Sequence, residues 1–189
     1  MGITITKPQE QMILSGLLYT GKIIRNGRNY YYRETFPERR YDFCQFKRKV
    51  LGDLISKSGV HPIKNQQGRI GFCTVNDPIF IAYRACTNMD LIRRMDDLGL
   101  VTFLLTQGCT VGARMTISGS HLSGDEYLVI AERMKALFDI DTRIYQKGII
   151  LTASDFVKLF PIVYQVTREY GLNFMDQIYP SKVTITPIG

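Results

Sequence analysis

The sequence predicts an α+β fold in which an αββαββα unit occurs twice in tandem, with antiparallel sheets and internal pseudo-two-fold symmetry. Two observations lead to this prediction. A short apolar, helix-like run closed by a glycine occurs at residues 13–21 and again at residues 100–108, nearly half of the 189-residue chain apart. The same order of hairpin and helix signals follows each run. The chain is long enough for two such halves to share a proper core.

The first half takes its elements from turn and capping signals. A proline in the first turn begins a helix over residues 8–19, and Gly21 closes that run. An Asn-Gly pair predicts a hairpin over residues 22–36. Apolar residues at three- and four-residue spacing predict a helix over residues 37–56. A second hairpin over residues 60–75 and an Asp-Pro helix start complete the unit.

The second half repeats this order. A helix over residues 100–107 ends at Gly108, and a strand-like segment with a glycine interruption at position 112 follows it. A capping box predicts a helix from Ser123 to about Phe138, before a hairpin over residues 141–152. The last predicted helix covers residues 154–166, and its internal proline predicts a kink or a broken register.

We therefore predict a first half over residues 1–88, a second half over residues 89–170 and a C-terminal tail over residues 171–189. Either half alone would leave apolar helix faces exposed, so we expect the two opening helices to pack together. Small residues allow helix backbones to approach closely. The residues predicted at this interface of the halves are Ser15, Gly16, Gly21, Thr102 and Gly108.

Composition limits the partners. The formal net charge is +7 and the pI is about 9.3, which is typical of a protein with a polyanionic partner; basicity without function is the alternative that charge alone leaves open. The longest apolar runs are too short to span a bilayer, so no membrane partner is expected. The four cysteines form no C-x-x-C pair and lie far in sequence from both histidines. This pattern predicts free thiols in a reducing, intracellular compartment and no zinc site.

Together the motif runs and the repeated order resemble the single-chain, double-motif LAGLIDADG homing endonucleases. Residues 13–21 and 100–108 match the two motif positions. The resemblance implies a saddle-shaped monomer with central motif helices, whose two sheets lie in the major groove of duplex DNA. It also implies an acidic residue before each closing glycine, which holds a divalent metal at the scissile phosphates. Hard cations such as Mg²⁺ take oxygen ligands, and the metal activates water there.

The sequence departs from the family at those two positions. Thr20 and Gln107 precede the closing glycines, and neither is an acid. The two-acid mechanism therefore does not carry over, and we predict no catalytic residue, no metal ligand and no cofactor. Mg²⁺ would be used only if cleavage is retained through a spatial neighbour such as Glu10 or Asp90.

We predict a cleavage-deficient nucleic-acid-binding protein on this scaffold, either a sequence-specific DNA binder or an intron RNA maturase. Its partner would be double-stranded DNA or structured intron RNA, in the cytoplasm or nucleoid or in an organellar matrix. The alternatives are an active metal-dependent homing endonuclease with non-standard ligands and a structural subunit of a ribonucleoprotein particle. Arg and Lys contact phosphate and guanine, and Gln can read adenine. The candidate contact residues are Lys22, Arg25, Arg28, Arg33, Lys64, Gln66, Arg69, Arg114, Arg143, Tyr145 and Lys147.

Overall fold

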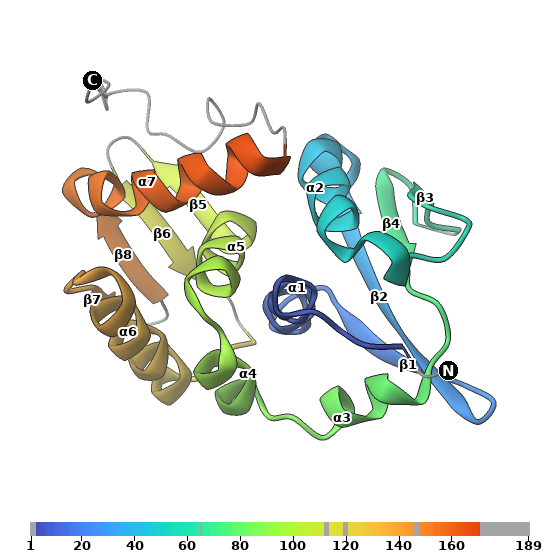
Figure 1. The fold of residues 1–189 in the computed structure, drawn as a ribbon. Coiled ribbons are helices and arrows are strands. Elements are labelled where there is room, and N and C mark those ends of the chain that lie inside the picture. Colours follow the sequence, from blue (N-terminus) through green and yellow to red (C-terminus); the bar gives the residue numbers. More distant parts are fainter. Residues whose placement is uncertain (1–2, 65, 112–113, 119–120, 146–147, 171–189) are drawn as a thin grey trace.

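A central pair of helices joins the two halves of the protein in the computed structural model (Figure 1). The model describes residues 3–64, 66–111, 114–118, 121–145 and 148–170. The central pair consists of α1 (Lys7–Leu17) and α5 (Asp97–Gln107), which pack against each other. These are the two predicted motif helices. Helix α5 leads directly into the first strand of its sheet, whereas a short turn over residues 18–21 separates α1 from the first strand of its own.

The first half places a four-stranded antiparallel sheet beside α1, in the order β1-β2-β4-β3. The Asn-Gly turn joins the first two strands as predicted, with Gly27 at a φ of 62°. The elements after α1 are β1 (Lys22–Asn26), β2 (Asn29–Pro37), η1 (Glu38–Arg40), α2 (Tyr41–Leu51), η2 (Gly52–Leu54), β3 (His61–Pro62), β4 (Arg69–Cys73), η3 (Pro78–Phe80) and α3 (Ile81–Arg84).

The second half repeats this topology with its own four-stranded antiparallel sheet, in the order β5-β6-β8-β7. A capping box between Ser123 and Glu126 opens its long helix, as predicted. Its elements are α4 (Asn88–Arg94), α5, β5 (Gly108–Val111), β6 (Arg114–Ser118), α6 (Gly124–Phe138), β7 (Arg143–Tyr145), β8 (Gly148–Thr152) and α7 (Ala153–Tyr170). The repeat confirms the predicted α+β fold with two antiparallel sheets.

Three predicted elements differ in detail. The helix expected over residues 37–56 is divided into η1, α2 and η2, and Gly52, at a φ of 52°, ends α2. The segment expected as one interrupted strand over residues 110–118 forms two strands, β5 and β6. Helix α7 runs through Pro161 to Tyr170, beyond the predicted end at residue 166. The predicted tail, residues 171–189, lies outside the described residues.

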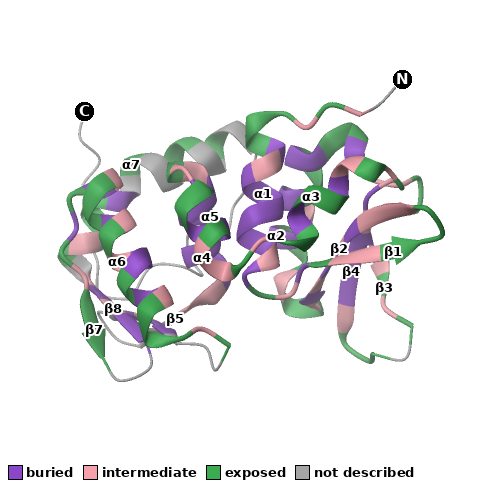
Figure 2. Cartoon of the chain, turned by 90° about the horizontal axis from the view of Figure 1, so that it is seen from below, coloured by how far each residue is buried: buried purple, intermediate pink, exposed green. Residues whose placement is uncertain are grey.

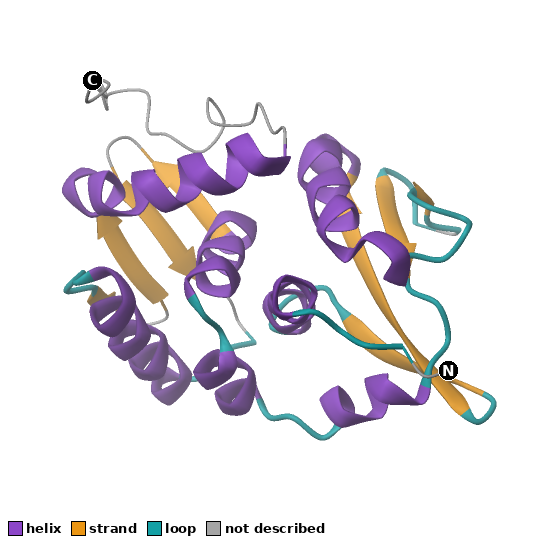
Figure 3. Ribbon diagram, in the orientation of Figure 1, coloured by secondary structure: helices purple, strands orange, loops and turns teal. Residues whose placement is uncertain are grey.

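Each sheet has one face covered by helices and one face without them, which we call the open face (Figure 3). Burial follows this division, because Tyr32, Glu34 and Phe36 alternate along β2 and are buried while their neighbours are partly exposed. Figure 2 shows the buried residues concentrated in the helix pair and on the covered faces. None of the helices in the described part of the chain combines the length and hydropathy that a bilayer crossing requires.

Candidate nucleic-acid interface

Strand register places three predicted cations on the open face of the first sheet. Lys22 pairs with Arg33, and Pro37 pairs with Arg69. Directly opposed residues of an antiparallel pair share one face, and Tyr32 and Glu34 occupy the covered face. Two like charges opposed across strands destabilise a sheet. The Lys22–Arg33 pair is therefore a cost to the protein alone, which a bound polyanion would offset.

The cations of this face lie close to other open-face groups. Burial raises the pKa of the Cys73 thiol, and the adjacent guanidinium of Arg33, its strand partner, lowers that pKa in part. Arg69 donates through Nη2 to the Thr35 carbonyl at 3.3 Å and to Thr35 Oγ1 at 3.0 Å. This anchor fixes the guanidinium of Arg69 over β2.

The other first-half candidates lie at the ends of the strands or on the opposite face. Arg28 lies in the turn between β1 and β2, whereas Lys64 and Gln66 lie exposed in the loop between β3 and β4. Arg25 pairs with Tyr30, which puts it on the side of the covered face, and its Nε donates to the Gly27 carbonyl at 3.1 Å. Alternation therefore separates Arg25 from Lys22 and Arg33 on the open face, and its contact with nucleic acid stays a prediction.

The second sheet offers fewer candidates. Arg143 and Tyr145 of β7 are exposed, and they pair with Ile150 and Gly148. The intervening Ile149 is buried, so Arg143 and Tyr145 lie on the open face. Arg114 pairs through its backbone with Thr152, but its side chain and all of Lys147 lie outside the described part of the chain.

Thr20 and Gln107, which we call the motif ends, lie where α1 and α5 turn into their sheets. Both side chains are partly exposed, yet Thr20 Oγ1 and Gln107 Nε2 are buried and have no hydrogen-bond partner within the described protein. At the same end of the helix pair, the rings of Tyr19 and His121 approach to 5.8 Å between centroids and link the two halves.

Arg40, which the sequence reasoning missed, reaches across from η1 to the end of α5. Its Nη1 donates to the Leu105 carbonyl at 3.1 Å and to the Thr106 carbonyl at 2.5 Å. The last carbonyls of a helix carry partial negative charge, and a guanidinium stabilises them. The only sequence signal was its place in a basic run next to a predicted helix start.

The motif ends do not fit a divalent metal. A hydroxyl and an amide bring no negative charge, and Arg40 places a cation beside the second of them. In the described ranges, no three His, Cys, Asp or Glu side chains cluster as metal ligands. The two neighbours that could have supplied a carboxylate are engaged elsewhere. Glu10 forms an ion pair with Arg94, and Asp90 accepts hydrogen bonds from Thr87 that lower its carboxyl pKa.

The glycines expected between the halves instead lie against their own sheets. A Cβ at Gly16 would overlap the Tyr32 hydroxyl and lie 2.8 Å from Glu34 Oε2. A Cβ at Gly21 would lie 2.7 Å from Tyr32 Cε2, and one at Gly108 would overlap Met115 Sδ. The nearest neighbours of these three glycines belong to the same half, and their role between the halves stays a prediction.

The other two predicted interface residues are buried without showing a polar contact between the halves. Ser15 Oγ donates to the Met12 carbonyl at 3.1 Å and accepts from Lys47 Nζ at 3.4 Å, both in its own half. Thr102 is fully buried on α5. Gln11 does make a polar contact between the halves, since its Oε1 accepts from the Asp96 backbone N–H at 2.9 Å beside Gly99.

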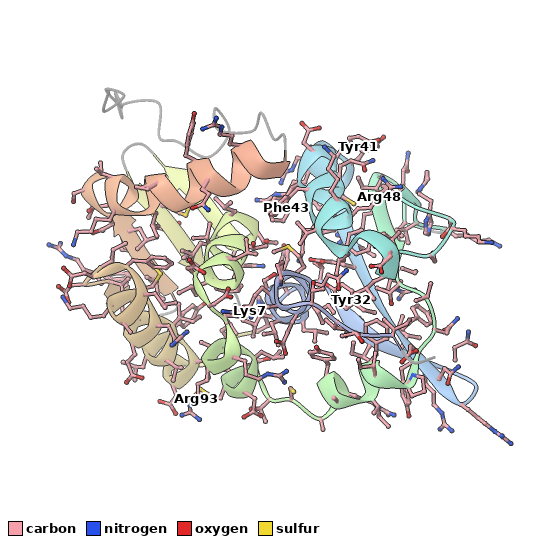
Figure 4. All side chains as sticks on the ribbon, in the orientation of Figure 1. Lys7, Tyr32, Tyr41, Phe43, Arg48 and Arg93 are labelled. Carbon is pink, nitrogen blue, oxygen red and sulfur yellow. The ribbon has the colours of Figure 1, made fainter. Side chains whose placement is uncertain are left out.

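A charged cluster is buried beneath the open face of the first sheet. Glu34 and Lys47 form an ion pair at 2.8 Å with both side chains fully buried, and the Tyr32 hydroxyl donates to Glu34 at 2.5 Å. Burial lowers the pKa of Lys47, although Glu34 opposes that shift. Burial and then the Glu34 charge raise the pKa of Tyr32 well above its usual value. Figure 4 shows Tyr32 beside α1.

Comparison with known proteins identifies the fold. No protein-family model and no curated protein matches the chain. A solved structure of the homing endonuclease I-WcaI bound to its DNA recognition sequence matches with a TM-score of 0.69 at 15% identity, covering 97% of this chain and 89% of that one. The homing endonuclease I-DmoI in complex with DNA and Mn matches with a TM-score of 0.52 at 12% identity, covering 84% and 96%. The chain therefore has the fold of the LAGLIDADG homing endonucleases.

Proposed function

We propose that this protein binds duplex DNA sequence-specifically through the open faces of its two sheets and does not cleave it. The opposed Lys22–Arg33 pair supports this proposal most directly, because a polyanion would relieve its repulsion. The similar structures support the choice of duplex DNA, since I-WcaI is bound to its DNA recognition sequence and I-DmoI is in complex with DNA.

The distribution of charge gives the first half the larger share of binding. Residues 1–88 contain fourteen Lys and Arg against six Asp and Glu, whereas residues 89–170 contain nine against ten. Phosphate neutralisation by Lys and Arg supplies most of the sequence-independent affinity for DNA. The first sheet would therefore provide most of the attraction, and the second would add contacts through Arg143 and Tyr145.

The neutral motif ends support the loss of cleavage. Metal-dependent hydrolysis needs ligands that hold a hard cation against the scissile phosphate. Thr20 and Gln107 bring no charge, and Arg40 adds a positive one at the end of α5. A cation there would meet repulsion rather than ligands.

Selection from a random duplex DNA library, with sequencing of the bound fraction, tests the binding. We expect an enriched consensus and an affinity that falls steeply as salt rises, because bound phosphates release counterions. Structured RNA serves as competitor in the same assay. If no duplex is enriched, or if RNA displaces every selected duplex at equal concentration, the DNA-binding proposal is wrong.

Incubation of the selected duplex with the protein in Mg²⁺ and then in Mn²⁺ tests the proposal that the protein does not cleave DNA. We expect the duplex to remain intact at protein concentrations that saturate binding. A staggered double-strand cut in either metal would instead show an active endonuclease with non-standard ligands.

A further inference from the structure

The motif ends present hydrogen-bond donors where a cleaving relative would present carboxylates. A buried polar atom without a partner costs about 1–3 kcal/mol, and such atoms in a native structure call for an explanation. Thr20 Oγ1 and Gln107 Nε2 are two such atoms, and they occupy equivalent positions in the two halves. A ligand at the ends of the motif helices would satisfy both atoms.

The two donors lie at the same end of the helix pair. Helices α1 and α5 pack together, and each is followed in the chain by the first strand of its sheet. The Tyr19–His121 contact joins the two halves at this end. Both residues remain partly exposed although the two donor atoms are covered, so each side chain must rotate to present its donor to a ligand at this end of the helix pair.

The charge around the donors suits an anion. Helix C-termini carry partial negative charge and repel phosphate unless a cation intervenes. Here the guanidinium of Arg40 lies on the last carbonyls of α5, and Lys22 follows Gly21 at the end of the first motif. The protein therefore supplies its own positive charge at both helix ends.

We propose that the motif ends bind a backbone phosphate of the nucleic acid directly, without a divalent cation. Thr20 Oγ1 and Gln107 Nε2 donate to the phosphate oxygens, and the charge of Arg40 offsets the dipole of α5. Thr and Gln side chains are ordinary phosphate donors, whereas a carboxylate needs a cation between itself and the phosphate. The proposal rests on the nucleic-acid-binding function above and adds the chemistry of its centre.

Fluorescence anisotropy with a labelled random-sequence duplex, in EDTA and in Ca²⁺ at equal ionic strength, tests this assignment. We expect the wild-type chain to bind equally in both buffers. The double variant Thr20→Asp/Gln107→Asp should bind about tenfold more weakly in EDTA, which corresponds to about 1.4 kcal/mol, and should regain affinity in Ca²⁺. This reversal of metal dependence is a result that misfolding would not produce.

Neutral variants separate the donors from the added charge. Thr20→Val/Gln107→Ala should weaken binding in both buffers equally, and Arg40→Gln should weaken it further because the dipole of α5 is then no longer offset. Thr102→Val is the matched control, since its Oγ1 is also buried and unpartnered but lies along α5 rather than at its end. It should bind like the wild type, and thermal unfolding checks that every variant folds.

The outcomes distinguish this inference from the proposed function. Wild-type binding that tightens in Ca²⁺, or a Thr20→Val/Gln107→Ala variant that folds and binds like the wild type, would overturn direct phosphate binding and leave DNA binding intact. A wild-type chain that binds no duplex in either buffer would overturn both.

Discussion

The two halves share a topology but differ in the chemistry beneath their sheets. Strand register makes Tyr32 equivalent to Met115 and Glu34 equivalent to Ile117, counting from the closing glycines. Glu34 and Lys47 are the only charged side chains among the buried described residues, and both belong to the first half. The second half buries apolar groups at the matching strand positions.

The motif helices also differ at equivalent positions. Gly16 lies five residues before Gly21, and Phe103 lies five residues before Gly108. In the first half the helix glycine lies against a large strand residue, because a Cβ at Gly16 would overlap the Tyr32 hydroxyl. The second half has a fully buried phenylalanine at that helix position.

The ionic cluster supports the half that carries the positive charge. Glu34 lies on the covered face of β2, and its neighbour Arg33 lies on the open face. Lys47 of α2 and Ser15 of α1 hold that strand from behind through Glu34 and one another. The first half thus uses a buried ion pair to hold its binding strand, whereas the second half has apolar side chains at the matching positions of β6.

Among the variants that disturb the buried cluster of the first half, Lys47→Met should have the largest effect on stability. It leaves the Glu34 carboxylate buried without its ion-pair partner, which costs about 3–5 kcal/mol of unfolding free energy. Chemical denaturation of the wild type and the variant measures this loss. A loss below about 1 kcal/mol would mean that the pair contributes little to the fold.

The triple variant Tyr32→Phe/Glu34→Ile/Lys47→Met is the matched comparison, because it gives the first half an apolar core like that of the second. Replacing a buried ion pair by apolar residues of similar volume is often neutral or stabilising. We therefore expect the triple variant to regain most of the stability that Lys47→Met loses, which would show that the pair serves geometry rather than net stability.

The sequence alone predicted the order of elements but not this cluster. The closing glycines, the Asn-Gly turn and the capping box are local signals, and each lies where the structure has the expected feature. The Glu34–Lys47 pair joins residues on different elements, and Lys47 looked like part of a solvated basic face. The hydrogen bond from Arg40 of η1 to the Leu105 carbonyl of α5 is likewise a contact between the halves, and local sequence patterns cannot reveal it.

Only part of the candidate interface could be predicted, because local patterns do not show how strands pair with one another. Alternation along a strand assigned Lys22 to one face, but the register between strands was needed to bring Arg33 beside it and to place Arg69 on the same face. The glycines Gly16 and Gly21 were identified as close-packing positions, yet their partner was their own sheet. A glycine in the sequence indicates that another element packs closely against it, but it does not indicate which element that is.

Gly16→Ala tests the close approach of α1 to Tyr32 and Glu34 of β2. The added Cβ would overlap the Tyr32 hydroxyl and crowd Glu34, so the buried cluster must shift. Overpacking of this kind costs about 1–3 kcal/mol. Gly124→Ala is the control, since a Cβ there meets nothing within 4 Å. Equal stability of the two variants in thermal unfolding would contradict the packing account.

Removal of open-face cations tests whether the first half dominates binding. Lys22→Ala and Arg33→Ala should each weaken duplex binding by about 1 kcal/mol and lower the salt slope by about one, as expected for phosphate contacts. Arg143→Ala in the second half, which carries no net positive charge, should have a smaller effect. Equal losses in anisotropy titrations for all three variants would mean that the halves share the binding evenly.

Alkaline unfolding gives the smallest expected difference, because it probes one hydroxyl of the cluster. The pKa of Tyr32 is raised in the fold, so the native state keeps a proton that the unfolded state releases near pH 10. Unfolding free energy should therefore fall as pH rises above 10, by at most about 1.4 kcal/mol per pH unit for this group. Over the first half of a pH unit above pH 10, the change in unfolding free energy of the Tyr32→Phe variant should differ from that of the wild type by less than about 1 kcal/mol.

The Tyr32 measurement is read as a slope, because loss of the hydrogen bond to Glu34 shifts stability equally at every pH below 10. Tyr83, whose pKa burial raises to about 12, contributes with the same sign and remains in every variant. Tyr31→Phe, on the open face of the same strand, is the control for removing a tyrosine hydroxyl that is not part of the buried cluster. A Tyr32→Phe variant with an unchanged slope would place the Tyr32 hydroxyl in contact with water, and the first half would then resemble the second more closely than the structure shows.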